Sequence, residues 1–275
     1  MTFPVGEGHH PLSVDKFEEA VRLVETFITK IRTKFDELIR LINQFVQSAW
    51  DELARSVFSR FIELFTHNVR EGLEKIRRHV EEVRSHVTQL LDHAQASIAG
   101  SVPVASLFTR AYDLVHKVNR PLTGLHGEMA GSGEIDFWRG PAKETYEKRV
   151  ATQQQAVLSA SEKVEALATF LGAAAAANTA YMARLAERLG QVYGAVVTAF
   201  VDVGAIGVGA ITQLMDLLAH FSETIGTAVA EVVGYIATLG ARVSEVLAQI
   251  LALETTRSDL TGLTRDGHWP APVSA

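Results

Sequence analysis

Prolines are absent from two long stretches of the chain, residues 12–102 and 142–269, and this limits the fold more than any other feature. The seven prolines lie outside them, at Pro4, Pro11, Pro103, Pro121, Pro141, Pro270 and Pro272. Proline inside a helix removes a backbone hydrogen bond and clashes with the preceding turn, so long stretches without it favour long helices. The sequence therefore predicts an all-α fold with no sheet.

Apolar residues in the first stretch repeat at alternating steps of three and four. They are Val14, Phe17, Val21, Val24, Ile28, Ile31, Phe35, Leu38, Ile42 and Phe45. This spacing is typical of a coiled-coil-like helix with one apolar stripe. Asp15 and Glu18 can form a capping box at its start. We therefore expect one helix over about 13–98, with a kink or break at 66–72, beside Gly72, as the alternative.

The chain divides into five expected segments. They are a flexible N-terminal arm at 1–12, the long helix plus a shorter one at 13–118, a glycine-rich loop at 119–136, a turn with an apolar helical hairpin at 137–256, and a tail at 257–275. The shorter helix is expected to end at Asn119 and Pro121, and the tail is either weakly ordered or docks through Trp269. Since rods of this length cannot be stable alone, we expect an elongated bundle of long antiparallel helices.

Charge and composition exclude several classes of function. Residues 1–150 carry 20 of the 26 lysines and arginines and 21 of the 32 acids, so no basic stripe collects for nucleic acid. The chain has no cysteine, which excludes disulfides and thiolate metal sites. It has no Gly-x-Ser-x-Gly elbow, and Gly204–Gly209 lacks the Lys-Ser/Thr of a phosphate loop. We therefore expect no enzyme, cofactor, metal or small-molecule substrate.

A Trp-Arg-Gly-Pro turn follows the glycine-rich loop. Pro141 suits the first position of a helix, where its missing N–H costs nothing. Gly140 allows the backbone of a sharp turn, and Trp138 can fix that turn in a groove between two helices with Tyr146 behind it. A recognition surface at the end of a helical hairpin is a second, compatible interpretation.

The second half of the chain holds a long apolar hairpin at 189–241. Between Arg188 and Arg242 its only charges are Asp202, Asp216, Glu223 and Glu231. Two predicted helices, 141–202 and 211–254, meet there at a glycine-rich turn. Residues expected to matter for helix packing or membrane entry are Gly190, Gly194, Asp202, Gly204, Gly207, Gly209, Gly226, Ala230 and Gly234. Small residues four apart let helix backbones approach closely, either in lipid or in a tight bundle. A buried core pair and a membrane-inserting pair therefore remain open.

Three histidines stand seven residues apart, at His79, His86 and His93. Metal binding from one helix needs a spacing of four, which they lack. They form either a solvated edge beside the apolar stripe or a pH-sensitive face that becomes charged near pH ~6.

Residues 137–171 resemble the WXG (ESX) family of type VII secretion substrates. The family's turn is matched by Trp138-Arg139-Gly140, followed by Ala142, Tyr146 and the helix containing Gln153-Gln154-Gln155-Ala156. Longer actinobacterial relatives place an apolar, glycine-rich helical segment after this region, as residues 172–241 do. The resemblance implies a WXG-type helix-turn-helix in a non-enzymatic, secretion-associated protein that acts by self-assembly or by binding a protein partner.

Two features depart from the family pattern. Some 135 residues precede the turn, where the family has a helix of about forty. The family's export tag, a tyrosine with an acid four residues later, is absent at all five tyrosines. Met1–Val14 has no apolar signal core, so the resemblance implies a bacterial cytoplasmic protein that reaches the envelope or exterior by a Sec-independent route, through a partner that carries the tag.

A looser, architectural resemblance to helical pore-forming toxins supports the alternative function. In that case the hairpin 189–241 would insert into a membrane.

Overall fold

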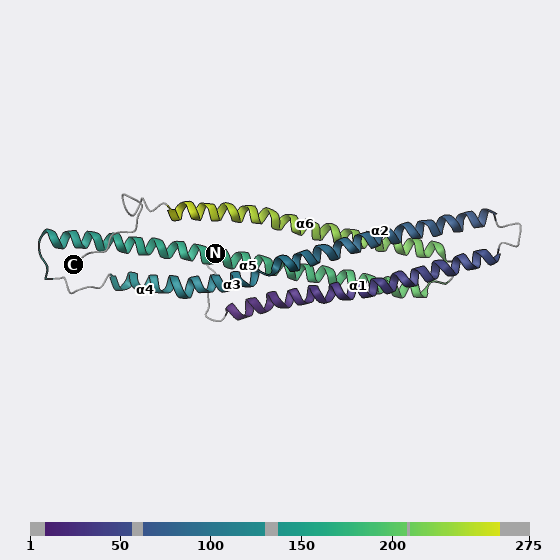
Figure 1. The fold of residues 1–275 in the computed structure, drawn as a ribbon, viewed down its shortest axis with the longest axis horizontal. Helices are drawn as coiled ribbons and strands as arrows, with labels where there is room; N and C mark the ends of the chain where they lie inside the picture. Colours follow the sequence, from purple (N-terminus) through teal and green to yellow (C-terminus); the bar gives the residue numbers. More distant parts are fainter. Residues whose placement is uncertain (1–8, 57–62, 130–136, 208–209, 259–275) are drawn as a thin grey trace. The chain divides into compact units, whose positions relative to one another are not determined.

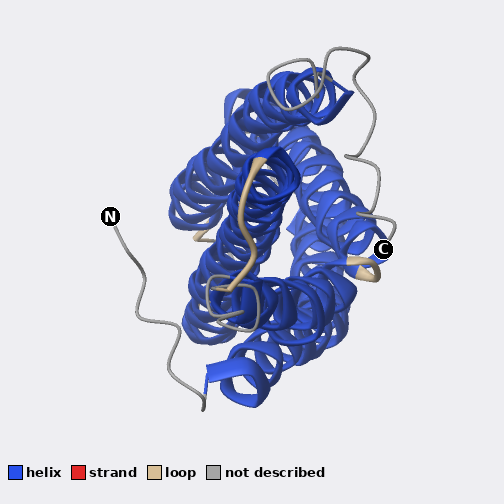
Figure 2. Ribbon diagram, turned by 90° about the vertical axis from the view of Figure 1, so that its left-hand side faces the viewer, coloured by secondary structure: helices blue, strands red, loops and turns tan. Residues whose placement is uncertain are grey.

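The computed structural model describes residues 9–56, 63–129, 137–207 and 210–258, and these residues are helical apart from short turns (Figure 1; Figure 2). The helices are α1 (His9–Ser56), α2 (Glu63–Ser101), α3 (Val104–Asp113), α4 (Arg120–Met129), α5 (Pro141–Ala205) and α6 (Ile211–Ser258). A π-helical segment, η1 (Leu114–Asn119), joins α3 to α4. No strand occurs in the described ranges, and the all-α prediction is confirmed.

The chain forms two compact units. The first comprises residues 1–14, 103–178 and 239–275, and the second comprises residues 15–102 and 179–238. The second unit contains most of the buried apolar side chains, contributed by α1, α2, the end of α5 and the start of α6. Those with no exposed surface include Ile31, Leu38, Ile76, Leu90, Leu189 and Ile225. Each of the four helices therefore buries an apolar stripe in the core of this unit.

Contacts within the second unit define how its helices run. Gly190 of α5 lies beside Phe27 of α1, and Gly204 lies beside Leu41, so α1 and α5 are parallel neighbours. Arg188 pairs with Glu231 at 2.8 Å across the antiparallel α5 and α6. The hairpin of α1 and α2 therefore packs against the hairpin of α5 and α6, with α1 beside α5 and α2 beside α6.

The helices α2 and α6 are also parallel neighbours. Gly72 lies against Ile211, and Gly226, fifteen residues further along α6, lies against His86, fourteen residues further along α2. A β-carbon added to Gly72 would stand 2.8 Å from Ile211 Cγ2, which is closer than real side chains approach. Gly72 therefore permits a close helix contact inside α2 and does not mark a break.

The first long helix differs from the expectation at both ends. It begins at His9, so Asp15 and Glu18 lie inside it and do not cap it. The single rod expected over 13–98 is two helices: α1 ends at Ser56 and α2 begins at Glu63, so residues 66–72 lie inside α2 and contain no break. Residues 1–8 of the expected N-terminal arm and residues 57–62 lie outside the described ranges.

Pro121 does not end the helix that begins at Val104. The chain widens to a π-helix over Leu114–Asn119, and Arg120 donates its N–H to Val115 five residues back. This change of register lets a proline, which has no N–H to donate, enter the next turn without breaking the chain of helices. Residues 120–129, including Gly124 and Gly127, are therefore helical and not part of a loop; residues 130–136 are not described.

The second proline-free stretch matches its prediction closely. Helix α5 spans Pro141–Ala205 and α6 spans Ile211–Ser258, against the expected 141–202 and 211–254. Ile206 and Gly207 lie in the turn between them, where Ala210 donates its N–H to Gly207 at 3.1 Å. Gly204 belongs to α5, and Trp269 with the rest of 259–275 lies outside the described residues.

A partly buried hydrogen bond joins α2 to α5 inside the second unit. Ser97 Oγ donates to the His93 carbonyl at 2.8 Å and lies 2.6 Å from Tyr181 Oη, a contact in which either hydroxyl can be the donor. Burial raises the pKa of Tyr181 above its ordinary value of 10.0, and the hydrogen bond with Ser97 acts in the opposite direction.

We expect the stability of the protein to fall above pH 10 through Tyr181. Because the folded-state pKa is raised, the contribution is fully present below the unfolded-state pKa and is lost as pH rises through the folded-state value. Tyr181→Phe should cost about 1 kcal/mol at pH ~8 through the lost hydrogen bond and should reduce the alkaline fall. Urea unfolding at neutral and alkaline pH measures both. Ser97→Ala is the control: it removes the same bond, keeps the buried phenol, and should keep the fall.

Candidate functional site

The Trp138 turn has the backbone that its sequence predicts. Gly140 has φ +84°, the one positive φ among the described residues, and this region of backbone space favours glycine. Pro141 is the first residue of α5. The Gly140 carbonyl accepts from the N–H groups of Lys143 at 3.1 Å and Glu144 at 3.4 Å, which closes the first turn of the helix.

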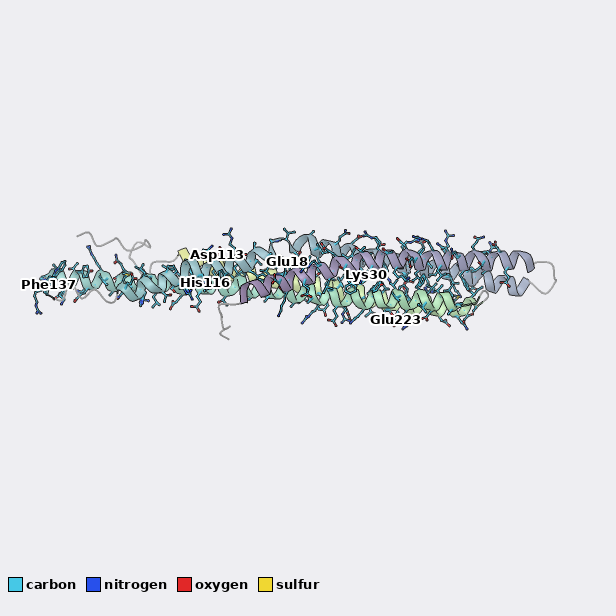
Figure 3. All side chains as sticks on the ribbon, turned by 90° about the horizontal axis from the view of Figure 1, so that it is seen from below. Glu18, Lys30, Asp113, His116, Phe137 and Glu223 are labelled. Carbon is cyan, nitrogen blue, oxygen red and sulfur yellow. The ribbon has the colours of Figure 1, made fainter. Side chains whose placement is uncertain are left out.

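The aromatic residues of this turn are largely open to solvent. Trp138 meets Tyr146 edge to face, with ring centroids 5.9 Å apart, so Tyr146 does pack behind it. Trp138 is 44% exposed and Phe137, labelled in Figure 3, is 75% exposed. The expectation that Trp138 is fixed in a groove between two helices is therefore wrong: its partner is a residue near the start of α5, the helix that the turn introduces.

Polar contacts hold α5 against the helices that precede the turn. Ser161 of α5 donates to the Asn119 side-chain oxygen, and its hydroxyl is 3.4 Å from that of Thr123 in α4. Because α4 precedes the turn and α5 follows it, these contacts pair α4 and α5 as the two arms of an antiparallel helical hairpin, and Trp138 lies just before the second arm.

Few apolar side chains of this hairpin are covered. In the described part of the first unit the buried apolar residues are Val104, Ala156, Val157, Ala168 and Ala175, four of them in α5. Large apolar side chains remain exposed on both arms, at Tyr112, Val118, Leu125, Leu158 and Leu167. The hairpin therefore buries small side chains between its arms and leaves larger ones accessible.

The apolar hairpin at 189–241 lies mostly in the second unit, where its stripe is buried. The buried side chains include Leu189, Val192, Val196, Val203, Leu214, Leu218, Phe221, Ile225 and Val232. Asp202 is exposed, and the side chains beyond Thr238 are not described except for a few exposed positions. By length and apolar composition alone, α5 could cross a membrane. In the structure 17% of the qualifying segment of α5 is buried.

The small residues of this hairpin do not act as one set. Gly190 and Gly226 bring α5 to Phe27 and α6 to His86. Gly194 and Gly234 have no atom within 4 Å of an added β-carbon, and Gly204, Gly207 and Ala230 are also exposed. The expectation of a continuous ladder of close helix contacts is therefore wrong for most of its members; Gly209 lies outside the described residues.

The three histidines of α2 are all half-buried but differ in their contacts. His79 Nδ1 lies 3.4 Å from Glu82, and His93 borders an open groove along the polar face of the helix. His86 faces Gly226 of α6, and its Nδ1 is buried with no hydrogen-bond partner among the described residues. They therefore do not form one face of equivalent groups.

The sequence did not reveal a set of contacts between lysines and aromatic rings. Lys30 (Figure 3) lies 5.8 Å from the ring centroids of both Phe27 and Tyr193, and Lys34 lies 3.7 Å from that of Phe200. The spacing of Phe27, Lys30 and Lys34 on α1 was visible, but their partners on α5 are far away in sequence. These cation–π contacts stabilise the pairing of α1 with α5.

No group of three histidine, aspartate or glutamate side chains that could hold a metal occurs in the part of the chain that the structure describes. A groove of about 620 Å³ is open to solvent and is lined from α2 alone, between Glu81 and His93. The candidate site is therefore the Trp138 hairpin.

The chain matches no protein-family model, no curated protein and no solved structure.

Proposed function

We propose that the protein is a non-enzymatic helical protein of WXG type that is exported by a type VII route and acts by assembly with itself or with a protein partner. The supporting observation is the Trp138 hairpin. Gly140 at φ +84°, Pro141 at the start of α5 and the Trp138–Tyr146 pair form the expected turn between two antiparallel helical arms.

The exposed side chains of the hairpin also support a partner-binding role. Leu125, Leu158 and Leu167 are accessible in the first unit, and a partner that covered them would bury apolar surface and so stabilise the complex. Since no tyrosine of the chain carries the acid that the family's tag requires, the partner that covers the hairpin would also supply the export signal.

Export is the direct test. The chain, expressed with an epitope tag for detection in an actinobacterial host, should appear in the culture filtrate when the type VII secretion ATPase is present. It should not appear there when the gene for the ATPase is deleted. Gly140→Val should reduce export, because a β-branched residue at positive φ costs roughly 1–3 kcal/mol and distorts the turn. Val201→Ala, at an exposed apolar position of α5 that lies in the second unit and outside the Trp138 hairpin, is the control and should export normally.

Equal export from the host with the secretion ATPase and from the host without it would contradict the proposal. So would equal export of Gly140→Val and the parent chain, provided that circular dichroism shows both to be helical.

A further inference from the structure

The chain has four methionines and no cysteine, so oxidation at sulfur is confined to methionine. The structure describes Met129, Met182 and Met215. Met182 is buried in the core of the second unit, at 1% exposed. Met129, the last residue of α4, and Met215 of α6 are half-buried. Of the described methionines, these two are therefore open to an oxidant dissolved in the solvent.

Met215 lies where α2 and α6 approach each other closely. Its Sδ is 3.6 Å, and Ile211 Cγ2 is 2.8 Å, from the position that a β-carbon on Gly72 would occupy. Because Ile211 and Met215 are four residues apart on α6, their side chains share one face of the helix, and Gly72 lies against both. The sulfur therefore takes part in the close contact that Gly72 permits.

The surroundings of this sulfur are apolar. Leu214 and Leu218, which flank Met215 along α6, are 0% and 1% exposed. Gly72 has no side chain, and it lies inside α2, where the helix itself uses its backbone N–H. None of these three neighbours therefore offers a hydrogen-bond donor to a new oxygen on the sulfur.

We propose that Met215 is a redox-sensitive switch: a peroxide oxidises its thioether to the sulfoxide, and the sulfoxide loosens the contact of α2 with α6. The sulfur attacks one oxygen of the peroxide. An S–O bond forms, the O–O bond breaks and, with hydrogen peroxide as the oxidant, water leaves; the sulfur loses two electrons and the peroxide gains them. This switch is independent of export and of any partner, and so goes beyond the proposed function.

Oxidation makes the flexible, apolar side chain of Met215 polar. The sulfoxide oxygen must either turn toward water, which draws the side chain away from Gly72, or stay at the contact without a hydrogen-bond donor. The first outcome removes packing, and the second leaves a buried acceptor unpaired. We therefore expect the equilibrium constant for unfolding to rise about tenfold on oxidation.

Mild treatment of the folded full chain with hydrogen peroxide tests the proposal. Mass spectrometry of its peptides should show oxidised Met215 and Met129 and unoxidised Met182. Urea unfolding followed by circular dichroism should show the rise in the unfolding constant, and methionine sulfoxide reductases should reverse it. Met215→Leu keeps the size and apolar character of the side chain, so peroxide should not change its unfolding. Met129→Leu is the matched control and should respond as the parent chain does.

A second pair of variants needs no oxidant. Glutamine has about the length and polarity of methionine sulfoxide, so Met215→Gln should raise the unfolding constant of the untreated chain about tenfold. Met129→Gln, at the other half-buried methionine, should change it by less than about twofold. Circular dichroism confirms that each variant is helical.

Four results would overturn the proposal: Met215 that stays reduced while Met129 is oxidised, oxidation of Met215 without a change in unfolding, equal effects of peroxide on the parent chain and on Met215→Leu, or a Met215→Gln chain as stable as the parent. Each of them leaves the proposed function untouched, because export is measured on the parent chain without peroxide.

Discussion

Replacing Leu214 with alanine is expected to lower the free energy of unfolding by about 2–5 kcal/mol. Leu214 is fully buried, at 0% exposed, near the start of α6 in the apolar hairpin. Removing most of its side chain loses apolar burial and leaves a cavity among the helices of the second unit. Urea unfolding followed by circular dichroism measures the change. Val201→Ala, in the same hairpin but 61% exposed, should change stability by less than about 0.5 kcal/mol.

The same pair of variants separates the two interpretations of the apolar hairpin. A hairpin that is a packed core in water makes Leu214 far more costly to truncate than Val201. Equal, small effects would mean that the hairpin does not pack in water, as a segment held ready for lipid would behave. Flotation with liposomes between pH ~5 and ~7.5 then tests the membrane alternative. Binding that Asp202→Lys abolishes would support insertion, and no binding at any of these pH values would oppose it.

Gly72→Leu is the second substitution with a large expected effect, a loss of about 2–3 kcal/mol. Even the β-carbon of a new side chain at this position would stand 2.8 Å from Ile211 Cγ2 and 3.6 Å from Met215 Sδ. The contacting atom of Ile211 is a branch methyl close to its backbone, so it cannot swing far away. The spacing between α2 and α6 must therefore increase, and neighbouring contacts are lost with it. Thermal and urea unfolding measure the change.

Gly194→Ala provides the comparison for Gly72→Leu. Gly194 is also a helical glycine of the second unit, but nothing lies within 4 Å of an added β-carbon. Alanine there should raise stability by about 0.5–1 kcal/mol through its better helix propensity. Loss of stability at Gly194, or none at Gly72, would contradict the helix spacing described for α2 and α6.

Proline placement and apolar spacing were enough to predict the all-α fold and most helix limits in the second half of the chain. Both signals are local, and both helices α5 and α6 are long enough to show them clearly. The Trp138 turn was also predictable, because a positive φ followed directly by a helix has a recognisable sequence in Gly140-Pro141.

The wrong predictions each assumed that one residue has the effect on local structure that its residue type usually has. Gly72 suggested a break because glycine is a weak helix former, but its role is set by Ile211, which is 139 positions away. Pro121 suggested a helix end, but the π-helical turn before it removes the need for its N–H. Trp138 suggested a buried anchor, although the partner it contacts is Tyr146 in the next helix.

The small residues of the apolar hairpin show the same limit of sequence-based prediction. Gly190, Gly194, Gly226 and Gly234 look alike in sequence, yet only Gly190 and Gly226 face another helix closely. Which face of a helix meets a neighbour depends on the rotation of both helices. Nothing in the spacing of α5 or α6 alone fixes that rotation.

The side-by-side pairing of α1 with α5 has a consequence during synthesis. Phe27 and Gly190 touch although 163 positions separate them, so the ribosome must make most of the protein before this contact can form. Until then the apolar surface of the nascent α1–α2 pair is exposed to solvent. Chains in this state bind chaperones and are prone to aggregation. We expect soluble yield to depend on chaperone supply and on slow translation more than the final stability would suggest.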